Sequence, residues 1–238
     1  MSSVGLAIHR LEPQSARGRA RLAKILDAAT NLFLKVGYEQ ASIDAILLQS
    51  GGSKSTLYAY FPTKQDLFRA VIDNVVDNSD LGTSLDISAN ARVVLTEFAV
   101  SRQRVVLSPR HRAVLGLVIA ERDRFPDLAR IYWERGPQRS GRQFITYLEA
   151  LRNREILAID DAEEAAEFFI GMLFQRWHRQ LFYLNVTPPS EALMRARAER
   201  VVARFWAAYQ RGPHYGPREL YRGTPGCGEP SSQAAPSR

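Results

Sequence analysis

The stretch SGGSKSTLYAYFPTKQDLF, residues 50–68, contains a glycine pair, a very short helix and a proline that ends it. Ser53 is placed to cap a helix over about 54–60, and Pro62 stops it because proline disfavours helical geometry in the residue before it. Leu57 lies on the inward face of this helix. The other side chains are hydroxyls, a lysine and two tyrosines, which a core helix of this length would not carry. We therefore expect a partner outside the chain to cover this surface.

Two helices before this stretch and one after it are predicted from caps and apolar spacing. Apolar residues recur every three or four positions over 22–36, which is one face of an amphipathic helix, and Gly37 is placed to end it. Ser42 can cap a second, short helix. Thr63 and Asp66 form a capping-box pattern, in its weaker Asp form, for the helix that follows Pro62.

A short helix, a tight glycine turn and a second short helix make a helix-turn-helix motif, whose second helix fits the major groove of DNA. The groove is about 12 Å wide and admits one helix, so this element must be short, exposed and held rigidly by its neighbours. Hydroxyls, phenols and the first amides of helices can all donate to phosphates. The stretch therefore predicts a surface that a DNA duplex covers.

The segment from Arg19 to Ile72 resembles the N-terminal domain of the TetR family of bacterial transcriptional regulators. ILDAATNLFLKVGYEQASIDAI and GGSKSTLYAYFPTKQDLF follow its pattern almost without gaps, over about a quarter of the chain. The resemblance implies that DNA, mostly its backbone, is contacted by Ser42, Lys54, Ser55, Thr56, Tyr58, Tyr60 and Lys64. We add Arg17 and Arg19 from the basic N-terminal end, and Ala59, which could touch a thymine methyl group.

Three positions depart from the family pattern. Leu47 replaces a small alanine, Gly52 replaces the usual valine or isoleucine of the turn, and Ala59 replaces a residue that is often larger and polar. We expect Leu47 and Gly52 to compensate in volume, because volume-conserving swaps are tolerated best. The departures also leave open a different function, that of a helical small-molecule-binding or adaptor protein with lost or weak DNA recognition.

Beyond a boundary loop at 78–88 every strong pattern is helical, so the predicted fold class is all-α. We expect an N-terminal helix-turn-helix DNA-binding domain and a C-terminal helical domain for effector binding and dimerisation. A break or kink is expected at Gly136-Pro137. The predicted division is a disordered basic arm over 1–18, the DNA-binding domain over 19–77, the helical domain over 78–211 and a disordered tail over 212–238.

The last two predicted helices, over 161–184 and 190–210, carry apolar residues on more than one face. A helix that is apolar on more than one face packs against two neighbours. The family resemblance implies that both helices pair with their copies in a homodimer. The alternative is burial within one subunit. The residues assigned to the dimer interface are Phe168, Met172, Phe174, Leu181, Met194, Val201 and Phe205.

The segment ERDRFPDLARIYWERG, residues 121–136, and the helix that contains Trp177 resemble the AefR-like subgroup of the same family. By family analogy, the middle helices enclose a pocket for a small-molecule effector that lowers DNA affinity. Aromatic residues at helical spacing are more often packing than ligand contacts. With that alternative kept open, the candidate pocket residues are His111, Phe125, Tyr132, Trp133, Trp177 and His178.

Composition excludes several other classes of protein. The formal net charge is +7, which favours polyanionic partners without specifying one. A single cysteine, Cys227, rules out a disulfide framework within the chain, and no apolar run reaches the ~20 residues of a membrane span, so we expect a cytoplasmic protein. The sequence has no HExxH, GxSxG, P-loop or GxGxxG motif, so we expect neither an enzyme nor a metal or cofactor site.

Overall fold

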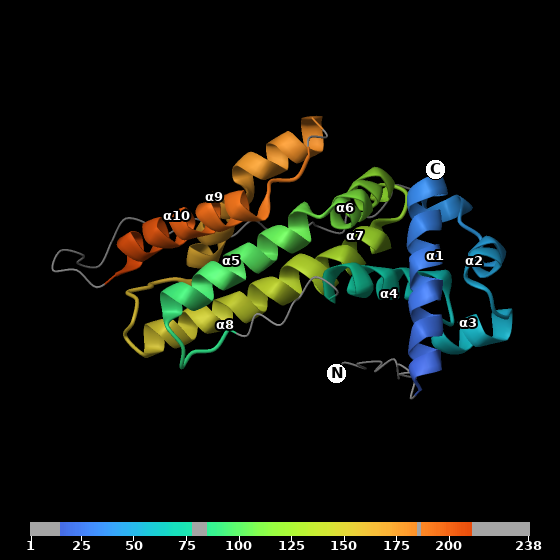
Figure 1. Cartoon of the computed structure of the whole chain (residues 1–238), viewed down its shortest axis with the longest axis horizontal. Coiled ribbons are helices and arrows are strands. Elements are labelled where there is room, and N and C mark those ends of the chain that lie inside the picture. The colour runs from blue at the N-terminus through green and yellow to red at the C-terminus, as the bar shows by residue number, and fades with distance from the viewer. Residues whose placement is uncertain (1–14, 78–84, 185–186, 211–238) are drawn as a thin grey trace, which may run out of the picture.

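The computed structural model describes residues 15–77, 85–184 and 187–210, and throughout these ranges the regular secondary structure is helical. Figure 1 shows an elongated molecule with the N-terminal helices at one end. The helices are α1 Ala16–Gln40, α2 Ile43–Ser50, α3 Lys54–Tyr60, α4 Lys64–Asp77, α5 Ala91–Leu107, α6 Pro109–Glu121, α7 Pro126–Trp133, the π-helix η1 Glu134–Gln138, α8 Arg139–Asn153, α9 Ala162–Leu184 and α10 Glu191–Tyr209. The all-α prediction is confirmed.

The first helix begins earlier than the sequence predicted. Ser15 caps α1, because its hydroxyl accepts a hydrogen bond from the Gly18 amide at 3.1 Å. Residues 16–18 are therefore helical, which corrects the expectation of an irregular arm through residue 18, while residues 1–14 lie outside the described part. At the other end, Gly37 has φ 81° and interrupts the helical geometry, as its predicted role as a terminator requires.

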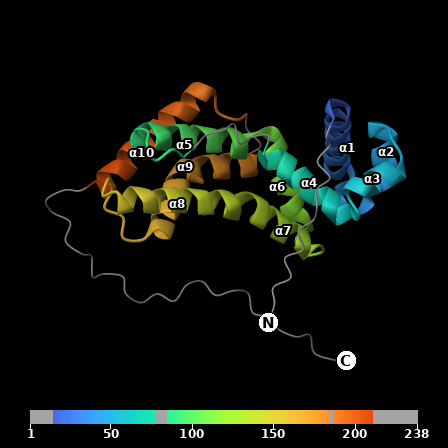
Figure 2. The same cartoon turned by 90° about the horizontal axis from the view of Figure 1, so that it is seen from below.

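The N-terminal helices share a core with two helices from much later in the chain. Phe33 and Phe68, both buried, meet edge to face at 5.6 Å between α1 and α4. The same apolar cluster includes Val114 and Val118 of α6 and Leu128 of α7. The packing boundary therefore does not follow the predicted division at residue 78, because α6 and α7 complete the core formed by α1–α4 (Figures 1 and 2). We call this end of the molecule, which the sequence predicts to bind DNA, the DNA-binding end.

A second core lies among α5, α8, α9 and α10. Four phenylalanines form its centre: Phe98 stacks on Phe144 at 4.4 Å, Phe144 meets Phe169 at 4.9 Å, and Phe169 meets Phe205 at 5.2 Å. Each comes from a different helix, and each is buried. Aromatic pairs of this kind stabilise a fold beyond the area that they bury, so this cluster joins the four helices.

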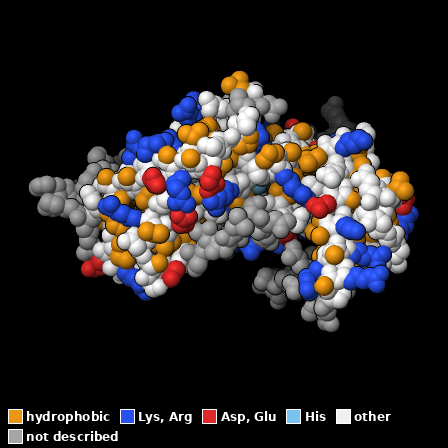
Figure 3. All heavy atoms as spheres, in the orientation of Figure 1, with side chains coloured by type: hydrophobic (Ala, Val, Ile, Leu, Met, Phe, Trp, Pro, Cys, Tyr) orange, Lys and Arg blue, Asp and Glu red, His pale blue; other side chains and the backbone are white. Residues whose placement is uncertain are grey.

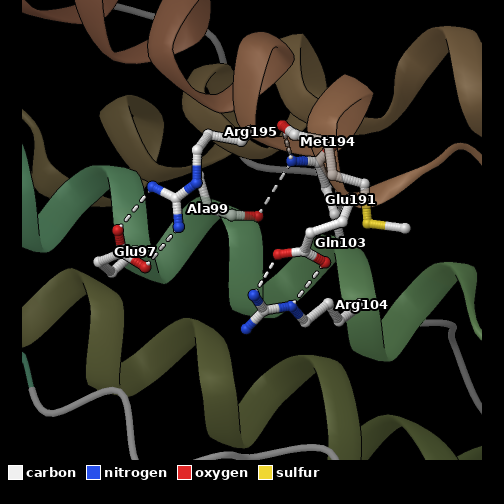
Figure 4. Close-up of polar contacts among 7 residues, drawn as sticks. All are labelled: Glu97, Ala99, Gln103, Arg104, Glu191, Met194 and Arg195. Carbon is white, nitrogen blue, oxygen red and sulfur yellow. Dashed lines mark hydrogen bonds and ion pairs between the residues drawn. The ribbon is translucent and has the colours of Figure 1, made fainter.

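The contact between α5 and α10 also contains polar groups (Figure 4). Gln103, fully buried on α5, donates from Nε2 to the carbonyl oxygens of Ala99 at 3.3 Å and of Met194, on α10, at 2.9 Å. Two ion pairs flank it: Arg195 with Glu97, at 2.8 and 3.2 Å, and Arg104 with Glu191. These hydrogen bonds hold the pKa of both carboxyl groups below the usual value.

The expected break at Gly136-Pro137 takes the form of a π-helical turn. Residues Glu134–Gln138 form η1, and α7, η1 and α8 follow one another without an intervening loop. Proline removes an amide donor, and a π turn is a known way to absorb such an irregularity. The Ser140 hydroxyl donates to the Gly136 carbonyl at 3.0 Å, which satisfies an acceptor at this point.

Candidate nucleic-acid interface

The turn between α2 and α3 is built by caps and glycines, as the sequence predicted. The Ser42 hydroxyl accepts from the Ala45 amide at 3.1 Å and begins α2, and the Ser53 hydroxyl accepts from the Thr56 amide at 3.2 Å and begins α3. Between the two helices, Gly51 has φ 70° and Gly52 has φ 126°. Side chains rarely adopt these backbone angles, so glycine fits both positions.

The outer surface of α3 is polar and accessible. Leu57 is the one buried residue of α3. Ser55 and Ala59 are exposed, and Thr56 and Tyr60 are half-buried. The Tyr58 side chain is 45% exposed, although it is a large aromatic group.

Three hydroxyls at the start of α3 form a small network. Ser53 Oγ lies 2.8 Å from Ser55 Oγ and 2.9 Å from Thr56 Oγ1. These hydroxyls and the phenols of the helix are groups that donate to phosphate oxygens. The surface is therefore chemically suited to a DNA backbone.

The two lysines of the predicted interface differ in their surroundings. Lys54 pairs with Asp44 at 2.8 Å on the surface, and this hydrogen bond raises the lysine pKa. Lys64 donates from Nζ to the Glu39 carbonyl at 2.8 Å, and its ammonium group lies 4.7 Å from the centre of the Tyr38 ring. Burial lowers the Lys64 pKa. Lys64 thus connects α4 to the end of α1, a role that its position in the motif did not predict.

The predicted compensation in volume between Leu47 and Gly52 stays a prediction, but the side chain nearest to the glycine is a different one. A Cβ atom at position 52 would lie 3.1 Å from Nη2, 3.5 Å from Nε and 3.7 Å from Cζ of Arg21. An arginine from α1 therefore lies closest to the glycine, and Leu47 is buried in the core of this end of the molecule. Sequence reasoning missed Arg21 because the contact joins residues 31 positions apart.

The DNA-binding end is connected to α6 and α7 by polar contacts. The Tyr38 amide donates to Glu121 Oε1 at 3.2 Å, and a Cβ atom at Gly37 would lie 2.9 Å from the same oxygen. Glycine therefore allows the Glu121 carboxylate to approach the backbone. Further contacts are Arg124 to Glu39 at 2.7 Å, Gln65 to Asp127 at 3.0 Å and Arg110 to Asp27 at 2.8 Å.

The candidate pocket residues do not gather in one place. His111 and Tyr132 are both buried, and the tyrosine hydroxyl lies 2.8 Å from His111 Nε2. Burial raises the Tyr132 pKa to about 12. Phe125 contacts Tyr38 edge to face at 5.2 Å, and Phe125 and Tyr132 belong to the core of the DNA-binding end.

The other pocket candidates lie elsewhere. Trp133 is 55% exposed, and Trp177 packs on the core of α5, α8, α9 and α10. The side chain of His178 lies outside the described part of the structure. His111 and Tyr132 thus form a buried pair, while the pocket candidates whose side chains are described lie in different parts of the fold.

The residues assigned to a dimer interface separate into two groups. Four of the seven are buried within the single chain, so their assignment is corrected: they are Phe174, Met194, Val201 and Phe205. Phe168 is 54% exposed and Met172 is half-buried, so both remain accessible on α9. The side chain of Leu181 lies outside the described residues. Leu193 of α10, 54% exposed, joins the accessible apolar residues.

The described residues contain no group of three His, Cys, Asp or Glu side chains that could hold a metal ion. Within the same residues, no helix is both long and apolar enough to span a bilayer. A two-helix motif with an exposed polar second helix, mounted on a larger helical body, defines a helix-turn-helix transcriptional regulator.

Comparison with known proteins identifies the family. Residues 25–71 match the model of bacterial regulatory proteins of the tetR family, and residues 93–211 match that of the AefR-like transcriptional repressor C-terminal domain. The chain belongs to the TetR family of transcriptional regulators and has an AefR-like C-terminal domain. It is a DNA-binding regulator and not an enzyme.

Similar solved structures extend over most of the chain. A TetR-family regulator from Mesorhizobium loti MAFF303099 is 28% identical, with a TM-score of 0.70 over 84% of this chain and 100% of that one. The flavonoid-responsive regulator FrrA is 31% identical, with a TM-score of 0.67 over 81% of this chain and 98% of FrrA.

Curated relatives match over a shorter part of the chain. The repressor ComR of Escherichia coli is 39% identical over 67 residues, which is 27% of this chain and 32% of ComR. The activator FasR of Mycolicibacterium smegmatis is 40% identical over 58 residues, 24% of this chain and 26% of FasR. The match thus spans about a third or less of each curated relative.

Proposed function

We propose that this protein binds a palindromic operator in the cytoplasm as a homodimer, represses transcription there, and is released by a small-molecule effector. The observation that carries the proposal is the exposed polar surface of α3, with Tyr58 45% exposed above a fully buried Leu57. A single helix-turn-helix reads only a few base pairs. A twofold dimer places two such helices on half-sites about one helical turn, or a multiple, apart.

The accessible surface of α9 and α10 supports self-association. Phe168 and Leu193 are each 54% exposed, on helices α9 and α10 that pack against each other, so a second copy of the chain could cover both side chains. Exposed acidic residues, Glu164 and Glu167, lie near the start of α9, and exposed Arg176 lies further along it. In an antiparallel pair of α9 helices, opposite charges would face each other across the twofold axis.

Release by an effector requires that the helical body and the DNA-binding end be coupled. Support comes from the contacts of α6 and α7 with α1, in particular Glu121 with the Tyr38 amide. A ligand that moves α6 would change the position of α1. The distance between the α3 helices of the two protomers would then change as well. FrrA, described as flavonoid-responsive, is consistent with a small organic effector.

The decisive experiment is selection of bound duplexes from a random pool by the purified full-length chain. We expect a palindromic consensus, a dimer mass by light scattering, and affinity that falls steeply with salt, because each phosphate contact releases counterions. A reporter placed downstream of the selected sequence then tests repression. Absent or salt-independent duplex binding would instead favour a helical adaptor or ligand-binding protein, and increased reporter output would indicate an activator.

A further inference from the structure

We propose that Arg21 is a phosphate-binding residue of the DNA-reading surface, and that Gly52 makes its position possible. The inference rests on the proposed function of that surface and adds a residue that the helix-turn-helix pattern does not assign.

The first step is the contact itself. The three atoms nearest to a Cβ built on Gly52 are Nη2, Nε and Cζ of Arg21, at 3.1, 3.5 and 3.7 Å. They belong to one guanidinium group, which therefore lies against the backbone of the turn between α2 and α3. A valine or isoleucine at position 52 would occupy this space.

The backbone angle at position 52 is a second, independent reason why valine or isoleucine does not fit there. Gly52 has φ 126°, a value that residues with a Cβ atom rarely adopt. A branched residue would have to change both the turn and the arginine position. Where the family usually has an apolar side chain in the turn, this chain has a glycine, and the Arg21 guanidinium lies beside it.

The second step is the state of the guanidinium. Arg21 is exposed, and no ion pair joins it to an acidic residue within the described part of the chain. Two cations nearby differ: Lys54 pairs with Asp44, and Arg110 pairs with Asp27. An arginine presents five donors in a planar fork that matches phosphate geometry, and those of Arg21 are available to a ligand.

The third step is the location. Arg17, Arg21 and Lys24 follow the spacing i, i+4 and i+7, so they share one face of α1, and all three are exposed. Figure 3 shows Lys and Arg side chains gathered over the end of the molecule where α1 begins and α3 lies. Like charges brought together on one face repel each other unless an anion lies between them. Gly52, which Arg21 contacts, directly precedes Ser53, whose hydroxyl belongs to the network at the start of α3.

The test measures duplex binding by fluorescence anisotropy over a series of salt concentrations, with the duplex selected above as the probe. For Arg21→Ala we expect roughly a tenfold loss of affinity, as for a hydrogen bond to a charged group. The slope of log affinity against log salt should decrease by about one, because one phosphate contact is lost. Arg21→Lys should recover most of the slope but less of the affinity. Lys35→Ala, exposed near the far end of α1, is the matched control and should change neither quantity.

A second variant tests the role of the glycine. Gly52→Ala should weaken binding in the natural chain, and by a smaller factor in the Arg21→Ala background, where the loss that comes from the arginine contact has already occurred and only the strain at φ 126° remains. Thermal midpoints of all variants identify any loss of folding. If Arg21→Ala keeps the natural slope while the parent binds DNA, the inference about Arg21 is overturned and the proposed function stands. If the parent binds no duplex, both are overturned.

Discussion

Helices α3 and α5 both carry polar side chains, but in opposite environments. In α3 a single residue, Leu57, is buried, and the polar side chains face outward. In α5 most residues are buried, and Ser101, Arg102 and Gln103 are among them. A polar group that faces solvent costs little and remains available to a partner, whereas a buried one must be satisfied inside the fold. The comparison shows that α3 leaves its polar groups available to a partner, and that α5 forms part of the scaffold.

The largest effect is expected in the scaffold core. Phe169→Ala should lower the free energy of unfolding by about 3–5 kcal/mol, because the side chain is fully buried and contacts Phe144 and Phe205. Chemical denaturation measures this change. Leu48→Ala, at a side chain 88% exposed on α2, should change stability by less than about 0.5 kcal/mol. Equal losses for both variants would contradict the described burial.

A smaller loss of stability is expected at the buried amide of α5. Gln103→Leu removes the donor to the Met194 carbonyl, and a lost buried hydrogen bond costs about 1–3 kcal/mol. Denaturation curves of this variant should be compared with those of Gln143→Leu, since Gln143 is exposed on α8. If Gln103→Leu leaves the free energy of unfolding unchanged, the contact between α5 and α10 does not depend on this amide.

Alkaline pH should destabilise the fold through one buried phenol in each core, Tyr132 and Tyr147. Burial raises the pKa of Tyr132 and of Tyr147 from 10.0 to about 12. As pH rises above 10, the unfolded chain gains stability by ionising these phenols while the folded chain does not, so the free energy of unfolding should fall until about pH 12. Denaturation at several pH values measures the fall, which Tyr132→Phe should make shallower. A flat profile would contradict the burial of these hydroxyls.

The smallest change in stability, and a large change in binding, is expected on α3. Tyr58→Phe should alter the free energy of unfolding by less than about 0.5 kcal/mol, because the side chain is 45% exposed. Its affinity for the selected duplex should fall roughly tenfold if the phenol donates to a phosphate. Anisotropy titration measures the affinity. Unchanged affinity would remove Tyr58 from the set of proposed DNA contacts.

Local sequence signals determined much of the DNA-binding end. Ser42, Ser53 and the pair Thr63 and Asp66 act as the predicted caps, and the Thr63 amide donates to the Asp66 carboxylate at 3.1 Å. Such signals are readable because a cap joins residues only three positions apart. The proposed DNA contacts on α3 follow from the same local pattern, since a helix with one buried side chain leaves its polar ones exposed.

Other features depend on contacts between distant segments. The core assignments of Phe174, Met194, Val201 and Phe205 could not be separated from an interface by periodicity, because an apolar face does not reveal which neighbour covers it. The buried pair of His111 and Tyr132 likewise requires α6 and α7 to be placed side by side.

The sequence by itself determined the helices, their caps and the two-helix motif with its exposed polar surface, because these depend on residues a few positions apart. Only the tertiary structure placed the Arg21 guanidinium beside Gly52, the Glu121 carboxylate at the Tyr38 amide and the Gln103 amide against α10. Each of these contacts joins segments that are far apart in the chain. Their partners are set by how whole helices pack, which no local pattern specifies.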